Sequence, residues 1–582
     1  MTRADLPALR REIRRIHGRG PFEAGPELPV HRTGPPLHPA TGDAKTVASF
    51  MSSRRRSLTV SLALLSATPA LLQAEAFNFE SLCERARGLA AKPYAPHPGK
   101  LADYWANLSY DQHRDIRFKM ESGLWWKDGT FSIDFFHPGW TAKKTISIYE
   151  VEGNEATALK FDTSLFDYGK NKIPAGTPPP PGYAGWRART HLNSKEYMDE
   201  FLVFLGASYF RAIPKGAPYG LSARGLSINS GLPGVAEEFP DFTEFYLEHP
   251  GKDAKTLSAT ALLEGESVAG AYKFTVTPGE ETVMDVEAEL TLRRPVQQLG
   301  LAPFSSMFWF GENTHPRPYD FRPEVHDSDG FLMELGSGNL HYRPLEHTKD
   351  QFRHCVFTME GPRSWSLVQR DRSFASYQDV EAGYHNRPSV KVEPVSGFAN
   401  GKLHLIEMPT IDETNDNVIL VWEPTPAPEV GKPFRFHYRL HWIRDPKPSG
   451  LFTVRATRAG NPVQKPDEVL MTIDFAKPLN PEKKVGDPKW DDISKLKPVV
   501  TVNQPGVKIL HVGMEDMSMA NVDDVPAGLG RSDQLHMPQV LRAFFVLDPS
   551  KDIHDIDMTC ELQDEDGKVV SERWIYLWKR TH

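Results

Sequence analysis

Short segments in which apolar and polar residues alternate constrain the fold of this chain more than any other feature. The alternation is clearest at residues 131–135, 145–148, 272–276, 283–290 and 404–406. A period of two places every second side chain on the same face of a strand. Turns rich in Gly (43 residues) and Pro (49 residues) separate these segments, and no helical pattern alternates with them. We therefore predict an all-β protein whose antiparallel sheets stack as a sandwich.

The chain divides into three predicted parts. Residues 1–76 form an upstream extension and a signal peptide, and residues 77–446 form a large β-sandwich domain. Residues 447–582 form a linker and a small immunoglobulin-like β-sandwich domain, because the last hundred residues carry about seven short alternating segments, the strand number of that fold. Two helical patterns precede the strands, at 77–91 and 101–110.

The stretch after Met51 has the three parts of a secretory signal peptide. A basic run at Arg54–Arg56 is followed by an apolar run from Leu58 to Leu65, and Ala74-Glu75-Ala76 supplies the small residues of a cleavage site. The apolar run is too short to span a bilayer as a mature helix. We predict that translation starts at Met51, that the mature chain starts at Phe77, and that a Sec or Tat signal exports it to the periplasm. A short buried helix is the alternative.

Composition and motifs exclude several classes of function. The chain has 68 basic and 76 acidic side chains and a net charge of −8, which argues against a nucleic-acid-binding protein. Its three cysteines allow one disulfide and form no CxxC metal motif. No GxSxG, HExxH, P-loop or GxGxxG motif is present. We therefore predict neither a metal nor a cofactor.

Three segments combine several carboxylates with aromatic, histidine or arginine side chains. They are residues 322–330, 369–388 and 409–417. Hydrolysis of a glycosidic bond uses two carboxyl groups, one protonated and one ionised, so this composition favours a sugar-cleaving site. Solvated turns, which are rich in Asp and Asn, are the alternative. A calcium loop at 412–417 is a further alternative, although the segment lacks the Gly and terminal Glu of an EF-hand.

Eight segments along the chain carry a resemblance to a known family. They are Phe136-His137-Pro138-Gly139, Gly206–Ala212, Tyr219–Leu226, Glu237–Pro240, Gly270–Phe274, Arg322–Gly330, Arg387-Pro388-Ser389 and Asp412–Asn417. From about Phe77 to its end, the chain resembles the periplasmic glucan biosynthesis proteins G and D of Gram-negative bacteria, with a pattern closer to G. The resemblance implies a large sandwich with a cleft, a small immunoglobulin-like domain, and a role in making osmoregulated periplasmic glucans.

The resemblance also implies an activity and its catalytic residues. The family acts on a β-1,2-linked glucose backbone, and its members include inverting endo-β-1,2-glucanases. The general acid of the family falls on Asp416, and the general base falls on Asp327, which works through a water and a substrate hydroxyl. The implied partners are the β-1,2-glucan and the inner-membrane glucan synthase machinery. The alternative is a non-hydrolytic glucan-binding factor that assists backbone export or branching.

Residues around the two carboxylates are predicted to bind sugar. Tyr384 offers a ring for stacking, Arg387 offers paired hydrogen-bond donors, and Glu413 adds a carboxylate near Asp416. The alternative is that Tyr384 is a core residue and that Arg387 forms a surface ion pair. The chain departs from the family pattern in the segments Val390–Pro394 and Phe398-Ala399, where tryptophans are common. The sequence therefore does not predict which length of glucan the protein prefers.

Overall fold

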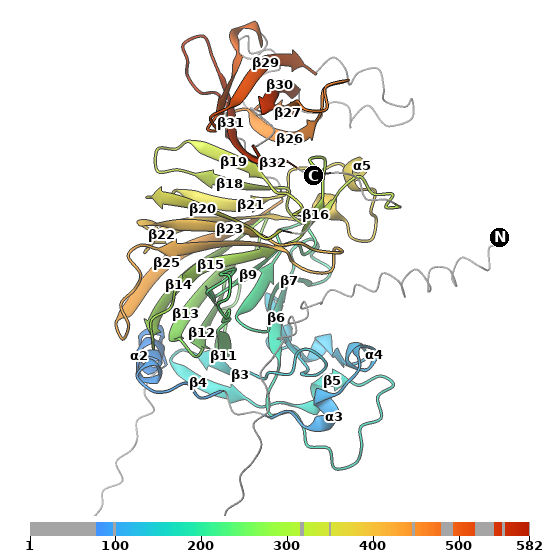
Figure 1. Cartoon of the computed structure of the whole chain (residues 1–582). Helices are drawn as coiled ribbons and strands as arrows, with labels where there is room; N and C mark the ends of the chain where they lie inside the picture. The colour runs from blue at the N-terminus through green and yellow to red at the C-terminus, as the bar shows by residue number, and fades with distance from the viewer. Residues whose placement is uncertain are drawn as a thin grey trace, which may run out of the picture. The chain divides into compact units, whose positions relative to one another are not determined.

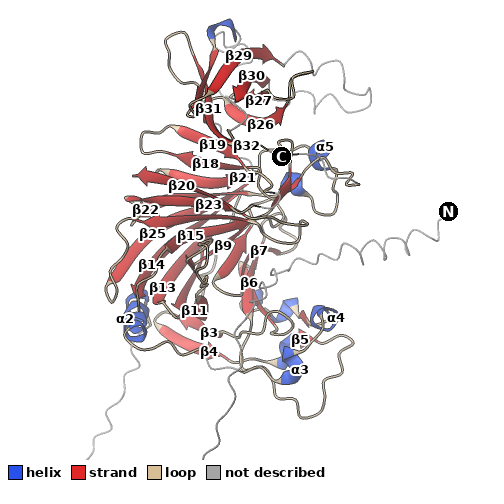
Figure 2. Cartoon of the chain, in the orientation of Figure 1, coloured by secondary structure: helices blue, strands red, loops and turns tan. Residues whose placement is uncertain are grey.

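The computed structural model describes most of the chain after residue 76. The described residues are 77–96, 100–314, 319–348, 351–444, 449–478, 493–517, 540–549 and 553–580. The predicted signal peptide and the start at Met51 lie outside them. Figures 1 and 2 show that strands dominate the fold and that helices are short. The all-β prediction is confirmed.

The first large sheet has ten strands. Their order is β2 (Phe131–Phe136), β6 (Gly185–Thr190), β7 (Asp199–Leu205), β8 (Tyr209–Ala212), β9 (Ser222–Arg224), β15 (Leu299–Ser306), β24 (Val418–Pro424), β23 (Asn400–Glu407) and β20 (Arg353–Glu360), with β10 (Leu226–Ile228) paired to β15. Neighbouring strands in this sheet are antiparallel.

The second large sheet has fourteen strands. Their order is β28 (Lys497–Val502), β31 (Asp555–Gln563), β32 (Arg573–Lys579), β19 (Leu340–Pro344), β18 (Gly330–Glu334), β21 (Ser364–Val368), β22 (Ser389–Ser396), β25 (Pro433–Ile443), β14 (Glu281–Leu292), β13 (Val268–Thr277), β12 (Leu257–Glu264), β11 (Asp241–Glu248), β3 (Ser147–Glu152) and β4 (Glu155–Leu159). Two of its pairings, β3 with β11 and β19 with β32, are parallel.

The two large sheets enclose one hydrophobic core. Trp186 and Phe204 of the first sheet stack at 4.8 Å between ring centroids, and Phe204 meets Phe245 and Phe274 of the second sheet at 5.1 Å each. In β14, Met284, Val286, Ala288 and Leu290 are buried at every second position, as the alternation predicts. Burial of one face of each sheet against the other is the sandwich that the sequence predicts.

The C-terminal strands form a second, smaller sandwich. A four-stranded sheet has the order β26 (Thr453–Gly460), β27 (Val469–Ala476), β30 (Val540–Pro549) and β29 (Val507–Asp516). Its buried face packs on β28, β31 and β32 through a core that includes Met471, Phe545, Ile556 and Trp574. Because β32 also pairs with β19 of the preceding part, the two parts share a sheet. The predicted limit at residue 446 stays a prediction.

Helices occupy few positions. In the described part of the chain, the α-helices are α2 (Phe79–Ala90), α3 (Asp103–Ala106), α4 (Tyr110–Arg114) and α5 (Phe374–Tyr377), and the 3-10 turns are η1 (Met120–Ser122), η2 (Trp126–Asp128), η3 (Thr163–Leu165), η4 (Tyr384–Asn386) and η5 (Ile493–Lys495). The helix predicted over 77–91 is confirmed as α2, which begins after the capping residue Asn78. The single helix predicted over 101–110 is wrong. Ser109 caps a new helix by accepting from the Gln112 N–H, so α3 and α4 are separate.

Two short ribbons complete the strand list, namely β1 (Arg117–Phe118) with β5 (Phe166–Asp167) and β16 (Phe308–Phe310) with β17 (Val325–His326). The three cysteines, Cys83, Cys355 and Cys560, are free thiols, so the disulfide that the sequence allows is not formed. Among the described residues, no helix is both long enough and apolar enough to cross a lipid bilayer.

Candidate active site

A three-residue segment, Ser306–Phe308, holds the loops that carry the two candidate catalytic aspartates. Asp327 directly follows β17, and its N–H donates to the Met307 carbonyl at 2.8 Å. On the other side, the residue after Asp416 donates its N–H to the Ser306 carbonyl at 3.0 Å. The fold therefore brings together two carboxylates that lie far apart in the sequence, as the resemblance implies.

Asn417 fixes the loop of Asp416 with its side chain. Its amide nitrogen donates to the carbonyls of Phe308 and Met408 at 2.9 Å each, and its amide oxygen accepts from the Phe308 N–H at 2.9 Å. Asn417 is buried, so these hydrogen bonds lie in an environment where an unmade bond is costly. The carboxylate of Asp416 is thus attached to a rigid backbone.

The side chain of Asp416 is accessible to solvent and lies near two positively charged arginines, Arg211 and Arg224. Its side chain keeps 30 % of its surface exposed, and Arg211 Nη2 lies 3.9 Å from its Oδ2. The Ser222 hydroxyl donates to the same oxygen at 3.4 Å. Burial raises the pKa of the Asp416 carboxyl, and the negative charge of Asp327 raises it further, against the opposing effect of Arg211. A carboxyl with a raised pKa is suited to donate a proton.

Asp327 is buried and held by an arginine. The Arg387 guanidinium donates to Asp327 Oδ1 and also to the Ala382 carbonyl, at 3.2 Å from Nε and 3.1 Å from Nη2. The same guanidinium lies 4.5 Å above the centre of the Tyr384 ring. Arg387 therefore orients the candidate base through a charge-assisted hydrogen bond. The alternative of a surface ion pair does not describe it, since its side chain is 11 % exposed.

The structure corrects the stacking role predicted for Tyr384. Tyr384 is completely buried in a small cluster with Phe310, Val325 and Tyr377, and Arg387 covers its ring. A sugar has no free ring face to stack on there. The residue supports Arg387, as the core alternative implies.

Glu413 also has a structural partner. Arg322 Nη1 lies 2.5 Å from Glu413 Oε2, and the same guanidinium binds Asp320 at 2.8 Å and Asp379 at 3.0 Å. One arginine thus connects the three segments singled out in the sequence, because Arg322 belongs to 322–330, Asp379 to 369–388 and Glu413 to 409–417. Through its ion pair with Arg322, Glu413 holds the Asp416 loop in place. It lies beside the site in which it was predicted to bind sugar.

His326, the residue before Asp327, anchors the backbone next to the candidate base. It lies completely buried between Glu324 Oε2 at 3.0 Å and Gln369 Oε1 at 2.9 Å. Burial lowers the pKa of His326, but the hydrogen bond and charge of Glu324 outweigh this and raise it to about 9. Gln369 in turn donates to the His326 carbonyl at 2.9 Å. These contacts fix the backbone next to the candidate base.

Four functional neighbours escaped the sequence reasoning. Ser222, Arg211, Arg224 and Asn417 contact or influence Asp416 or its loop. Arg211, Ser222 and Arg224 were marked only by the resemblance, in the segments Gly206–Ala212 and Tyr219–Leu226, whereas Asn417 ends the acidic segment 409–417 without having been assigned a role. Ser222 and Asp416 are 194 positions apart, so no local pattern connects them.

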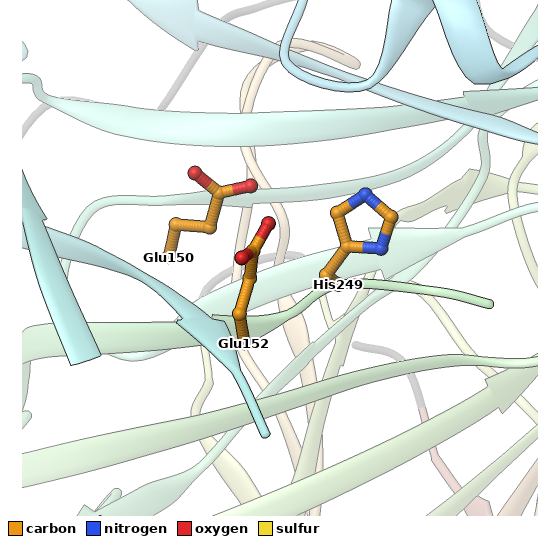
Figure 3. A group of neighbouring side chains, drawn as sticks. All are labelled: Glu150, Glu152 and His249. Atoms are coloured by element: carbon orange, nitrogen blue, oxygen red, sulfur yellow. The ribbon is translucent and has the colours of Figure 1, made fainter. Parts of the chain in front are cut away.

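Among the residues that the structure describes, two groups of side chains have the donor atoms of a metal site, and neither includes the aspartate pair. In the first, shown in Figure 3, the ligand atoms of Glu150, Glu152 and His249 lie within 4.8 Å of one another. Protein partners already engage it, because His249 Nε2 lies 3.2 Å from Asp128 and the Trp125 Nε1–H donates to Glu150 at 2.6 Å. The second consists of Glu312, Glu324 and Asp371. We assign no metal to the reaction.

Two stacked, mainly antiparallel sheets with a pair of carboxylates on their connecting loops define a β-sandwich protein with an acidic site. The family model described as "Periplasmic glucan biosynthesis protein, MdoG" matches residues 77–578. The chain belongs to this family, and its role is therefore in periplasmic glucan biosynthesis.

Named relatives agree with this assignment. "Glucans biosynthesis protein G" of Ralstonia nicotianae is 44 % identical over 428 residues, which cover 72 % of this chain and 84 % of the relative. The protein of the same name from Pseudomonas paraeruginosa is 35 % identical over 513 residues, covering 86 % of this chain and 92 % of the relative. The one from Vibrio cholerae is 42 % identical over 421 residues, covering 70 % and 76 %.

Proposed function

We propose that the protein is an inverting endo-β-1,2-glucan hydrolase that trims or sizes the backbone of periplasmic glucans. The observation that carries this proposal is the pair Asp327 and Asp416, held on opposite sides of Ser306–Phe308. The two carboxyls differ in setting, one paired with an arginine and the other carrying a raised pKa. Inverting glycosidases use such a pair, with room between the carboxyls for a water molecule.

In the proposed reaction, Asp416 donates its proton to the leaving glycosidic oxygen. Asp327 accepts the proton of the attacking water through a substrate hydroxyl, so the water enters on the face opposite the leaving group. Arg211 and Arg224 lower the pKa of Asp416 against the effect of burial. The two arginines would stabilise the carboxylate that Asp416 becomes after proton transfer, so that the proton can be transferred although burial opposes ionisation of the group.

The proposal extends to where the protein acts. The pattern after Met51 supports export by a Sec or Tat signal and a mature chain starting at Phe77. The family name supports the periplasm as the compartment. There the protein would meet the β-1,2-glucan as it leaves the inner-membrane synthase machinery.

Proton NMR of the reaction products tests the proposal. The mature chain is incubated with linear β-1,2-glucan, and the anomeric protons of new reducing ends are followed from the first minutes. Inversion of the β-linkage predicts that the α-anomer appears first and that mutarotation forms the β-anomer later. First appearance of the β-anomer would contradict inversion.

The names of the relatives favour one other candidate, because they state biosynthesis and not hydrolysis. In this alternative, the protein binds the glucan and assists export or branching. It predicts that the glucan binds and that its chain length stays unchanged in the same experiment.

A further inference from the structure

Two aromatic side chains project from the loop that precedes the candidate base. Tyr319 is fully exposed, and Phe321 keeps 75 % of its surface exposed. The residues that alternate with them point the other way, since Arg322 donates to Asp320 through its backbone N–H, its Nε and its Nη2. The loop therefore separates a polar, anchored side from an aromatic, solvent-facing side.

The anchored side of this loop is tied to both candidate catalytic segments. Arg322 pairs with Glu413, which lies three positions before Asp416, and with Asp379. In the other direction, the chain continues from Arg322 through β17 to Asp327. The loop is thus attached to both segments that carry the candidate catalytic carboxylates, and its exposed side chains lie close to them in the fold.

The two segments that Arg322 anchors each expose one further apolar side chain. Val380 follows Asp379, Ile411 lies two positions before Glu413, and both side chains are more than four-fifths exposed. Large apolar side chains exposed near a polar site commonly mark a binding surface. Here the apolar surface alternates with carboxylates and a guanidinium, a combination that matches a sugar ring, with its apolar faces and its rim of hydroxyls.

We propose that Tyr319 and Phe321 form a platform on which glucose rings of the β-1,2-glucan stack beside the cleavage site. This inference rests on the proposed function and takes over the stacking role that the sequence assigned to Tyr384. An aromatic face is large and rigid, so it contributes affinity with little loss of conformational entropy. The platform determines how firmly the chain on one side of the scissile bond is held.

Calorimetric titration with linear β-1,2-glucan oligosaccharides tests the platform. The titration uses Asp416→Asn protein, so that binding is measured without cleavage, and compares it with the same protein carrying Tyr319→Ala and Phe321→Ala. We expect the dissociation constant to rise about fourfold to a hundredfold, because each of the two stacked rings accounts for roughly a two- to tenfold change in affinity. Phe321→Tyr, which keeps the ring, should restore most of the contribution of that position.

A matched control is Tyr197→Ala. Tyr197 is also an exposed tyrosine, at 55 %, and it lies just before the start of β7. It is not next to the site residue Arg211 in the sheet, because the β7 residue that pairs with Arg211 is Val203. This variant should bind the glucan like its parent. Because all three aromatic side chains face solvent, their removal should leave the melting temperature unchanged.

The outcomes separate this inference from the proposed function. An unchanged dissociation constant in the Tyr319→Ala, Phe321→Ala protein overturns the platform, even if the wild-type enzyme cleaves the glucan. A larger dissociation constant in the double variant supports the platform. If the wild-type protein then binds the glucan without cleaving it, the proposed hydrolysis is contradicted and the platform is not. A change in oligomeric state with unchanged glucan affinity would show that the patch contacts a second copy, and it also overturns the platform.

Discussion

At the scale of single residues, Asp416 and Asp327 owe their different proposed roles to the partners that the fold supplies. Arg387 donates to Asp327, whereas the nearest guanidinium nitrogen to Asp416 is 3.9 Å away. Burial and the charge of Asp327 together raise the pKa of Asp416 more than Arg211 and Arg224 lower it. Asp416 therefore has the environment of a proton donor, and Asp327 that of a carboxylate oriented by an arginine.

The raised pKa of Asp416 predicts a pH-dependent effect on stability. Below the unfolded-state pKa of about 4, both states carry the proton, so Asp416→Asn should melt like the wild type. As pH rises through the folded-state pKa, ionisation costs the native state more than the unfolded state, so the wild type loses stability relative to Asp416→Asn. Thermal unfolding at pH 3.5 and pH 7 would measure this difference.

The control for that measurement is Glu280→Gln. The Glu280 side chain is 82 % exposed and pairs with Lys215 on the surface, so its contribution should be small at both pH values. If Asp416→Asn melts below the wild type at neutral pH, the carboxylate is stabilising there, and the assignment of the acid loses its physical basis.

At the scale of elements, the strands could be predicted from the sequence and the site could not. Alternation is a local property, so the predicted segments 272–276, 283–290 and 404–406 all lie within strands β13, β14 and β23. Tyr384 and Phe321 show the limit. Both are aromatic residues beside acidic segments, but long-range packing buries one and leaves the other exposed.

The connection between β16 and the Asp416 loop gives a prediction at this scale. Asn417→Ala removes three hydrogen bonds and leaves the N–H and carbonyl of Phe308 without that partner. Since each unsatisfied buried group costs about 1–3 kcal/mol, we expect unfolding by urea to show a loss of at least about 2 kcal/mol. Because the loop that carries Asp416 also loses these hydrogen bonds, kcat on the glucan should fall by a larger factor than KM changes.

Asn461→Ala provides the comparison for this effect. Asn461 also donates to two carbonyls, those of Pro466 and Glu468, but in an exposed loop of the C-terminal sandwich. Water can replace its hydrogen bonds, so stability and turnover should change little. Equal losses in the two variants would show that Asn417 has no special place in the site.

At the scale of the whole molecule, buried ion pairs join the C-terminal sandwich to the part that carries the site. Arg370 donates to both oxygens of Glu572 at 2.7 Å each, and Glu572 also accepts from the Val454 N–H at 2.8 Å. Nearby, Arg455 pairs with Asp371 at 2.7 Å. Arg370 lies in the segment that supports Asp329, through its backbone N–H, so the two parts are mechanically connected close to Asp327.

Removal of this connection should destabilise the whole molecule. Glu572→Ala leaves the Arg370 guanidinium buried without its carboxylate, which typically costs about 3–5 kcal/mol. Chemical unfolding followed by tryptophan fluorescence would measure the loss. Glu561→Ala is the matched control, because its partner Arg573 is 41 % exposed and the pair should contribute much less. A loss in Glu572→Ala no greater than in the control would argue against a rigid connection.

The central claim is that Asp416 and Asp327 act together as acid and base, and the chain length of linear β-1,2-glucan tests it most directly. Wild-type protein should shorten the glucan, and Asp416→Asn and Asp327→Asn should each do so at least about a hundredfold more slowly, because general acid–base catalysis typically contributes 10²–10⁴-fold. The double variant should be little slower than either single variant, as for groups that act in one transition state. Cleavage by Asp416→Asn at close to the wild-type rate would contradict the account.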